Sequence, residues 1–288
     1  MTQIPLGPLL SDTLRIVWTG ILRLLAFTLI YAIFLGGATI LLGVMLGLTF
    51  DSAENFADPE MSWMINLLAL VLTVLSVPYG CGMIYDAHER LHSRPSGLGA
   101  MFRQGFARTP RALVVLLIAF LIYIGLVFIV SFVLILPMAA AESQPFLVFL
   151  PLLLLPALVV GGMAIYCIWF LVPAVCVIEG RMGSSFGRSQ ALTKGSRFVL
   201  LAAMLVMGLV GTGLYVGVIL VALLVGAILE SIDSEILFYV AGAVGLIAYF
   251  VILMIMSSLQ LLLPTVAFVK LRELKEGGEP EGVVEVFQ

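Results

Sequence analysis

The sequence predicts an all-α fold: a six-span transmembrane helical bundle of three pseudo-repeated helical hairpins. Composition gives the first reason, because 62% of the 288 residues are hydrophobic and only 11% are charged. The mean hydropathy of +1.21 exceeds what a soluble domain of this length can hide from water. The number of long apolar runs and the distribution of positive charge give the other two reasons.

Six apolar runs are long enough to cross a membrane, since a hydrocarbon core of roughly 30 Å takes about 20 helical residues. The N-terminal segment lacks a basic region followed by a short apolar core and a cleavage site, so we expect no removable signal peptide and count the first run as a span. The six runs lie near 24–50, 62–85, 112–137, 146–178, 198–229 and 236–269.

The second, fourth and sixth runs each carry a proline toward their C-terminal ends, namely Pro78, Pro173 and Pro264. The fourth and sixth runs are also longer than a bilayer requires. They should tilt, project from the membrane or bend at their prolines, because proline lacks an amide donor and its ring clashes with the preceding turn.

Positive charge is fully segregated, because all fourteen Lys and Arg residues fall in four short stretches that alternate with base-free loops. Cytoplasmic loops retain Lys and Arg during insertion, so this pattern predicts a multi-pass protein of the bacterial cytoplasmic membrane with both termini in the cytoplasm. The basic stretches hold Arg15 and Arg23; Arg90, Arg94, Arg103, Arg108 and Arg111; Arg181, Arg188, Lys194 and Arg197; and Lys270, Arg272 and Lys275. The intervening loops hold Asp51, Glu54, Asp58 and Glu60; Glu142; and Glu230, Asp233 and Glu235.

A hairpin unit repeats three times, near 8–90, 97–180 and 183–270, within one transmembrane domain that covers 1–270. Each copy begins with a short basic segment, followed by an outgoing span, a base-free loop and a returning span. In the second copy, Leu98, Met101 and Phe102 fall on one side of a helix and Arg103 on the other. We therefore expect three interfacial helices on the cytoplasmic surface, called elbow helices here, near 8–20, 97–108 and 183–194. Residues 271–288 are expected to form a disordered acidic tail.

Small residues predict where helices approach closely, and the three cysteines predict packing rather than disulfides. Cys81, Cys167 and Cys176 all lie inside apolar runs, which does not suit a disulfide framework. Close helix contacts are expected at Gly43 and Gly47, at Gly213 and Gly217, and along Ala241, Gly245 and Ala248.

Residues 177–201 contain an acidic residue after a span, an amphipathic turn and the pattern Arg-Ser-x-x-Leu-Thr-x-Gly before the next span. The pattern is formed by Glu179, by Arg188 with Ser189, by Leu192 with Thr193, and by Gly195. This stretch resembles bacterial membrane proteins that include the membrane domain of glycerophosphoryl diester phosphodiesterases and the YciC-like proteins. Residues 93–110 are similar to an earlier connection in the same group. The resemblance implies a polytopic helical domain but no phosphodiesterase, because that activity belongs to a separate soluble barrel of about 250 residues.

One motif could carry chemistry. The residues His88, Glu89 and His92 match H-E-x-x-H, in which two histidines one helical turn apart bind zinc and the glutamate activates water. A zinc peptidase also needs a third protein ligand, and no third-ligand motif follows. Pro95 ends the helix soon after His92. We expect no metal or other cofactor here, and treat Glu89 as a low-ranked catalytic candidate and the two histidines as low-ranked zinc ligands.

The remaining candidates concern lipids and solutes. Juxtamembrane cations near an anionic leaflet are each worth about 1 kcal/mol, although the same charges could serve topology alone. The headgroup candidates are Arg15, Arg103, Arg108, Arg188, Lys194 and Arg197. The span interiors offer no ionisable pathway, and only Ser257, Ser258 and Gln260 of the last span could line a small polar cavity.

These observations predict a non-enzymatic membrane protein with an assembly, lipid-associated or partner-binding role. Its expected partners are membrane lipids, anionic ones included, and an unidentified membrane protein, but not nucleic acid. The alternative is a transporter of a neutral or lipid-like solute, since repeated hairpins can build a central pathway. An intramembrane zinc protease ranks third.

Overall fold

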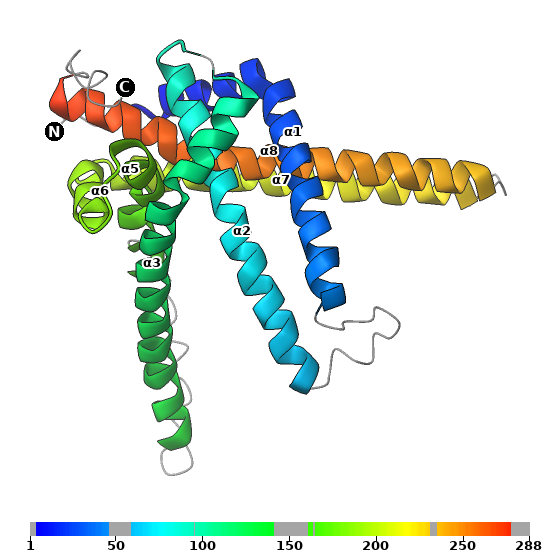
Figure 1. Ribbon diagram of the computed structural model, residues 1–288, viewed down its shortest axis with the longest axis horizontal. Helices are drawn as coiled ribbons and strands as arrows, with labels where there is room; N and C mark the ends of the chain where they lie inside the picture. The colour runs from blue at the N-terminus through cyan, green and yellow to red at the C-terminus, as the bar shows by residue number, and fades with distance from the viewer. Residues whose placement is uncertain are drawn as a thin grey trace.

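The computed structural model describes residues 4–45, 59–94, 96–140, 161–163, 165–230 and 235–277 (Figure 1). These residues are mostly helical, and no strand occurs among them. Six helical stretches in this part of the chain are long and apolar enough to cross a membrane. They are Leu6–Met45, Trp63–Leu91, Leu98–Phe132, Gly161–Glu179, Arg197–Gly226 and Tyr249–Glu276. The expected all-α class and the six candidate spans are thus confirmed.

The helices follow the chain as α1 Leu6–Met45, α2 Pro59–Leu91, α3 Leu98–Ala140, α5 Val172–Glu179, α6 Ser185–Thr193, α7 Arg197–Glu230 and α8 Glu235–Glu276. Pro78 lies inside α2 and Pro264 inside α8, whereas Pro173 stands in the first turn of α5, where its missing amide has no helical partner to lose.

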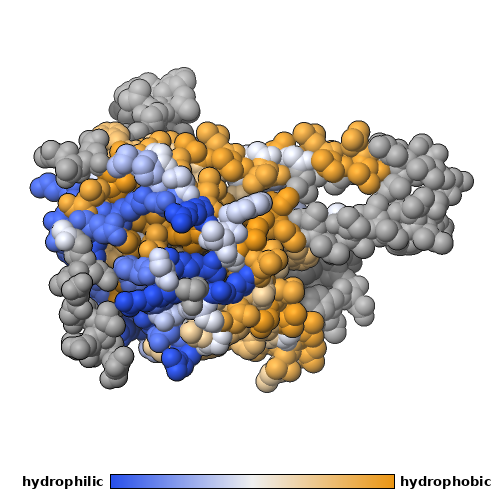
Figure 2. Space-filling model, turned by 90° about the horizontal axis from the view of Figure 1, so that it is seen from above, coloured by the Kyte–Doolittle hydropathy of each residue, from blue (hydrophilic) through white to orange (hydrophobic). Residues whose placement is uncertain are grey.

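One end of the molecule is closely packed, and we call it the base. It consists of the N-terminal parts of α1, α3 and α7, the C-terminal parts of α2 and α8, and both α5 and α6. Figure 1 shows α7 and α8 running side by side away from the base in one direction, while α1, α2 and α3 leave it in others. Hydrophilic residues gather over the base and hydrophobic residues over the helices beyond it (Figure 2). The four basic stretches of the sequence are therefore brought together at one end of the molecule.

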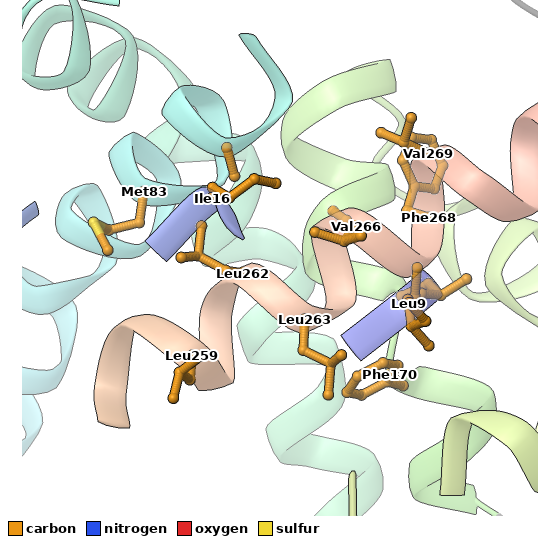
Figure 3. Close-up of a cluster of buried hydrophobic side chains, with 14 of the residues drawn as sticks. Leu9, Ile16, Met83, Phe170, Leu259, Leu262, Leu263, Val266, Phe268 and Val269 are labelled. Carbon is orange, nitrogen blue, oxygen red and sulfur yellow. The ribbon is translucent and has the colours of Figure 1, made fainter. Parts of the chain in front are cut away.

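The centre of the base is the last third of α8. Leu262 packs with Ile16 and Met83, and Leu263 packs with Leu9 and Phe170 (Figure 3). Leu262 is fully buried, and burying one such side chain contributes about 1.5–3 kcal/mol. α8 thus holds together α1, α2 and the segment just before α5.

Two glycines allow α2 and α3 to cross closely. A Cβ atom added at Gly82 would lie 2.8 Å from the Met101 carbonyl oxygen and 2.9 Å from Phe27 Cζ. A Cβ atom added at Gly105 would collide with the Pro78 carbonyl oxygen. Among the described residues, a Cβ at Gly213, Gly217 or Gly245 would meet nothing within 4 Å, so the close contacts expected there do not occur within this part of the chain.

The elbow helices agree with the expectation only in part. α6 is a separate short helix within 183–194, but residues 8–20 belong to α1 and residues 98–108 belong to α3. The helix continues through Pro110 because the segment before it is packed on α2 through Met101 and Gly105, both buried. Figure 1 shows the two ends of α1 running in different directions. The expectation of three separate elbow helices is therefore wrong for the first two copies.

The C-terminal tail also begins later than expected. α8 continues to Glu276, and Leu271 is fully buried within it. Residues 278–288 lie outside the described residues, as do the acidic loop residues between 46 and 58 and at 142.

Candidate functional site

The base contains a buried charge cluster around Asp86 on α2, whose side chain is 1% exposed. Its carboxylate accepts hydrogen bonds from Arg90 Nε at 2.6 Å and from Ser96 Oγ at 2.6 Å. Arg23 Nη1 of α1 lies 3.8 Å from the same carboxylate and donates to the Ser96 carbonyl oxygen. The Arg90 guanidinium rests directly on Gly20, where a Cβ atom would have no space. This cluster joins α1, α2 and the α2–α3 connection.

A second charge cluster lies around Arg188 of α6. Its guanidinium donates to Glu179 at 3.0 Å and to Glu276 at 2.8 Å, so it connects the end of α5 to the end of α8. Hydrogen bonding to Glu276 is the largest cause that raises the pKa of Arg188 above its ordinary value. Arg181 also pairs with Glu179, at 3.0 Å. The expected headgroup candidate Arg188 is thus engaged inside the protein.

Arg108 of α3 closes the C-terminal end of α5. Its Nη1 donates to the Val177 carbonyl oxygen at 2.8 Å, and its guanidinium carbon lies 4.8 Å from the centre of the Tyr85 ring. Arg111 lies against Gly180, which ends α5 with a φ of 67°. Two cations therefore face the negative end of a short helix, where they are favourable. Arg15 and Arg103, by contrast, are exposed.

A cavity of about 380 Å³ lies between α2, α3 and α5. Its wall is almost entirely apolar. Trp169 and Phe186, which contact each other edge to face, close one side, and Leu261 of α8 closes another. Two thiols from different helices, those of Cys81 and Cys176, line the same cavity. On α3 the lining residues are Ala112, Val115, Leu116 and Ala119, which share one helical face.

The two hydroxyl groups in the cavity wall already have hydrogen-bond partners. Ser76 Oγ donates to the Thr73 carbonyl oxygen at 2.7 Å, and the Tyr79 hydroxyl shares a 2.9 Å hydrogen bond with Thr28. An apolar cavity of this kind favours hydrocarbon over water or ions.

The polar residues expected to line a cavity lie elsewhere. Ser257 and Ser258 both donate to the Met254 carbonyl oxygen of their own helix, at 2.9 and 2.7 Å. Gln260 is exposed. None of the three lines the cavity described here, to which α8 contributes Leu261 instead.

The H-E-x-x-H residues lie at the end of α2. The rings of His88 and His92 are 4.5 Å apart, and His92 Nδ1 is 2.8 Å from the His88 carbonyl oxygen. Glu89, which follows His88 directly, is half-buried. No group of three or more His, Cys, Asp or Glu residues suited to a metal ion occurs among the residues that the structure describes.

Comparison with known proteins gives no match: a scan against protein-family models, a search of curated proteins and a search of solved structures each returned none.

Sequence reasoning missed Asp86 and the cavity. A signal for the first was present, because Asp86 and Arg90 are four residues apart at the end of an apolar run, a spacing that brings side chains together on a helix. No comparable signal exists for the cavity, whose wall comes from α2, α3, α5, α6 and α8 together.

Proposed function

We propose that this chain is a non-enzymatic, multi-pass protein of the bacterial cytoplasmic membrane whose apolar cavity binds an acyl chain of a membrane lipid. Both termini lie in the cytoplasm in this proposal, as the segregation of Lys and Arg favours. The observation that carries the lipid-associated role is the cavity of about 380 Å³ with its apolar wall.

The chemistry of the wall favours an acyl chain over other ligands. A charged solute would need ionised groups in the wall, and the described wall contains none; its two hydroxyl groups are already hydrogen-bonded. On α3 the lining residues run from Ala112 to Ala119, along a candidate span. This direction suits an acyl chain that lies parallel to the other lipid tails.

The three-hairpin repeat remains part of this proposal. It is supported by the presence of the three basic segments in the base, where Arg23, Arg108 and Arg188 each bond to another segment of the chain. A common origin of the hairpins would also account for the proline that the returning run of each copy carries, at Pro78, Pro173 and Pro264.

Tryptophan quenching tests the cavity directly, because Trp169 lines it and the chain contains three tryptophans. A protein with Trp18→Phe and Trp63→Phe would be reconstituted in vesicles of phosphatidylcholine with brominated acyl chains, which quench tryptophan on contact. Ala119→Phe fills the cavity, while Ala107→Phe on the same helix is the matched control, since Ala107 is exposed.

The proposal expects strong quenching of Trp169 that falls in Ala119→Phe and persists in Ala107→Phe. Equal quenching in both variants would show that the quencher reaches Trp169 from outside the cavity and would overturn the proposal. As a second measurement, native mass spectrometry should find fewer bound lipids on Ala119→Phe than on Ala107→Phe.

A further inference from the structure

The connection between α6 and α7 leads into backbone N–H groups that precede the first helical hydrogen bond of α7. Gly195 has a φ of +90°, and Ser196 is the residue immediately before α7. The Leu200 N–H donates to the Ser196 carbonyl oxygen at 3.0 Å, so the N–H groups of Arg197, Phe198 and Val199 precede the first helical hydrogen bond. They form the positive end of a 34-residue helix.

Two buried polar side-chain atoms at this helix start have no hydrogen-bond partner among the described residues. Ser196 is 1% exposed, and its Oγ makes no hydrogen bond, although a serine in this position ordinarily accepts one from the first turn. Arg197 Nε is likewise buried without a hydrogen-bond partner. A buried polar group without a partner is destabilising, so two of them at one helix start call for a ligand.

The same connection gathers cations that no carboxylate of the described residues neutralises. Lys275 Nζ of α8 donates to the carbonyl oxygens of Ala191 and Lys194, at 2.9 and 2.8 Å, which holds its charge against the connection. Within the described residues, Lys194, Arg197 and Lys275 form no ion pair with a carboxylate. The neighbouring Arg188, in contrast, is paired with two carboxylates.

The start of α7 suits a position at the boundary between lipid headgroups and hydrocarbon. Arg197 begins a candidate membrane span, and the next residue, Phe198, is 89% exposed. Apolar aromatic side chains are favoured in the hydrocarbon and Lys and Arg in the headgroup layer, so Lys194 and Phe198 together suit the boundary between the two layers.

We propose that the start of α7 binds a phosphate group, as carried by an anionic phospholipid or by free phosphate. Ser196 Oγ and the first backbone N–H groups of α7 would donate to the phosphate oxygens, and Lys194 and Arg197 would supply the charge. This site stands apart from the cavity, so either proposal can fail without the other.

Native mass spectrometry of the delipidated protein would measure binding of phosphatidylglycerol against diacylglycerol with the same acyl chains. The double variant Lys194→Gln/Arg197→Gln removes two cations from the site, and Arg15→Gln/Arg103→Gln removes two exposed cations from elsewhere in the base. A cation that contacts the bound headgroup is worth about fivefold in affinity, so the first variant should bind phosphatidylglycerol about 25-fold more weakly. The two control cations lie outside the proposed site, so their loss should weaken binding clearly less.

Ser196→Ala separates binding from folding. The substitution removes a hydroxyl that has no partner in the ligand-free protein, so thermal stability should stay equal or rise while phosphatidylglycerol binding falls several-fold. Adding inorganic phosphate as a competitor distinguishes a phospholipid headgroup from free phosphate as the natural ligand. Competition at millimolar concentration indicates a free-phosphate site, and no competition indicates a lipid headgroup. Equal binding of the two lipids, or equal losses in the site variant and the control, would overturn the proposal.

Discussion

Replacing Asp86 with alanine should destabilise the base more than any single loss of a surface charge. The carboxylate accepts hydrogen bonds from Arg90 and Ser96 at 2.6 Å each, and the Arg90 side chain is only 9% exposed. Removing one partner of a buried ion pair leaves the other charge without compensation, which costs about 3–5 kcal/mol. Arg90 cannot move away easily, since its guanidinium is packed against Gly20.

The free energy of unfolding can be measured by titration with a denaturing detergent and followed by circular dichroism. A thiol-reactive dye gives a second signal for the same transition, because Cys81, Cys167 and Cys176 are all buried. Glu273→Ala is the matched control, as Glu273 is an exposed acid in α8. The double variant Asp86→Ala/Arg90→Leu should recover part of the loss by removing the unpaired charge. A loss in Asp86→Ala no larger than in Glu273→Ala would refute this reasoning.

Three further predictions concern packing, the end of α8 and metal binding. Gly105→Ala should lower the unfolding free energy by about 1–3 kcal/mol, because its Cβ would collide with the Pro78 carbonyl oxygen. Gly99→Ala should be neutral or stabilising, since a Cβ there meets nothing within 4 Å. Equal effects of the two substitutions would contradict the close crossing of α2 and α3. Arg188→Gln should release the end of α8 and speed its proteolysis in inside-out vesicles, and an unchanged cleavage rate would count against the role of this ion pair. Elemental analysis of untagged protein should find no stoichiometric zinc; zinc near one equivalent that disappears in His88→Ala would favour the protease alternative.

The spans could be predicted because hydropathy is a local property of the chain. The expected run at 112–137 lies within α3, and the expected run at 198–229 lies within α7. The elbow helices were harder to predict, since an amphipathic period reveals which face of a helix is apolar but not whether the helix continues into the next span. At Pro110 the packing of the preceding turn on α2 decided the outcome.

The contacts of the base depend on residues far apart in the sequence, and this limited what could be predicted. Arg188 and Glu179 belong to one recognisable motif, but Glu276 comes from a segment expected to be disordered. Gly82 and Gly105 lie on different helices, so no spacing within either helix marks their contact. A cavity arises from what several elements leave unfilled, and composition cannot specify it.

Cysteine accessibility in intact cells tests the six-span account most directly. In a background without the natural cysteines, single cysteines at Ser184 and Gly97, both exposed in the base, should react with a membrane-impermeant maleimide only after the membrane is permeabilised. A cysteine at Asp233, in an acidic loop predicted to lie outside, should react in intact cells. Labelling of Ser184→Cys or Gly97→Cys from outside intact cells would contradict the assignment of the basic end to the cytoplasm and, with it, the six-span topology.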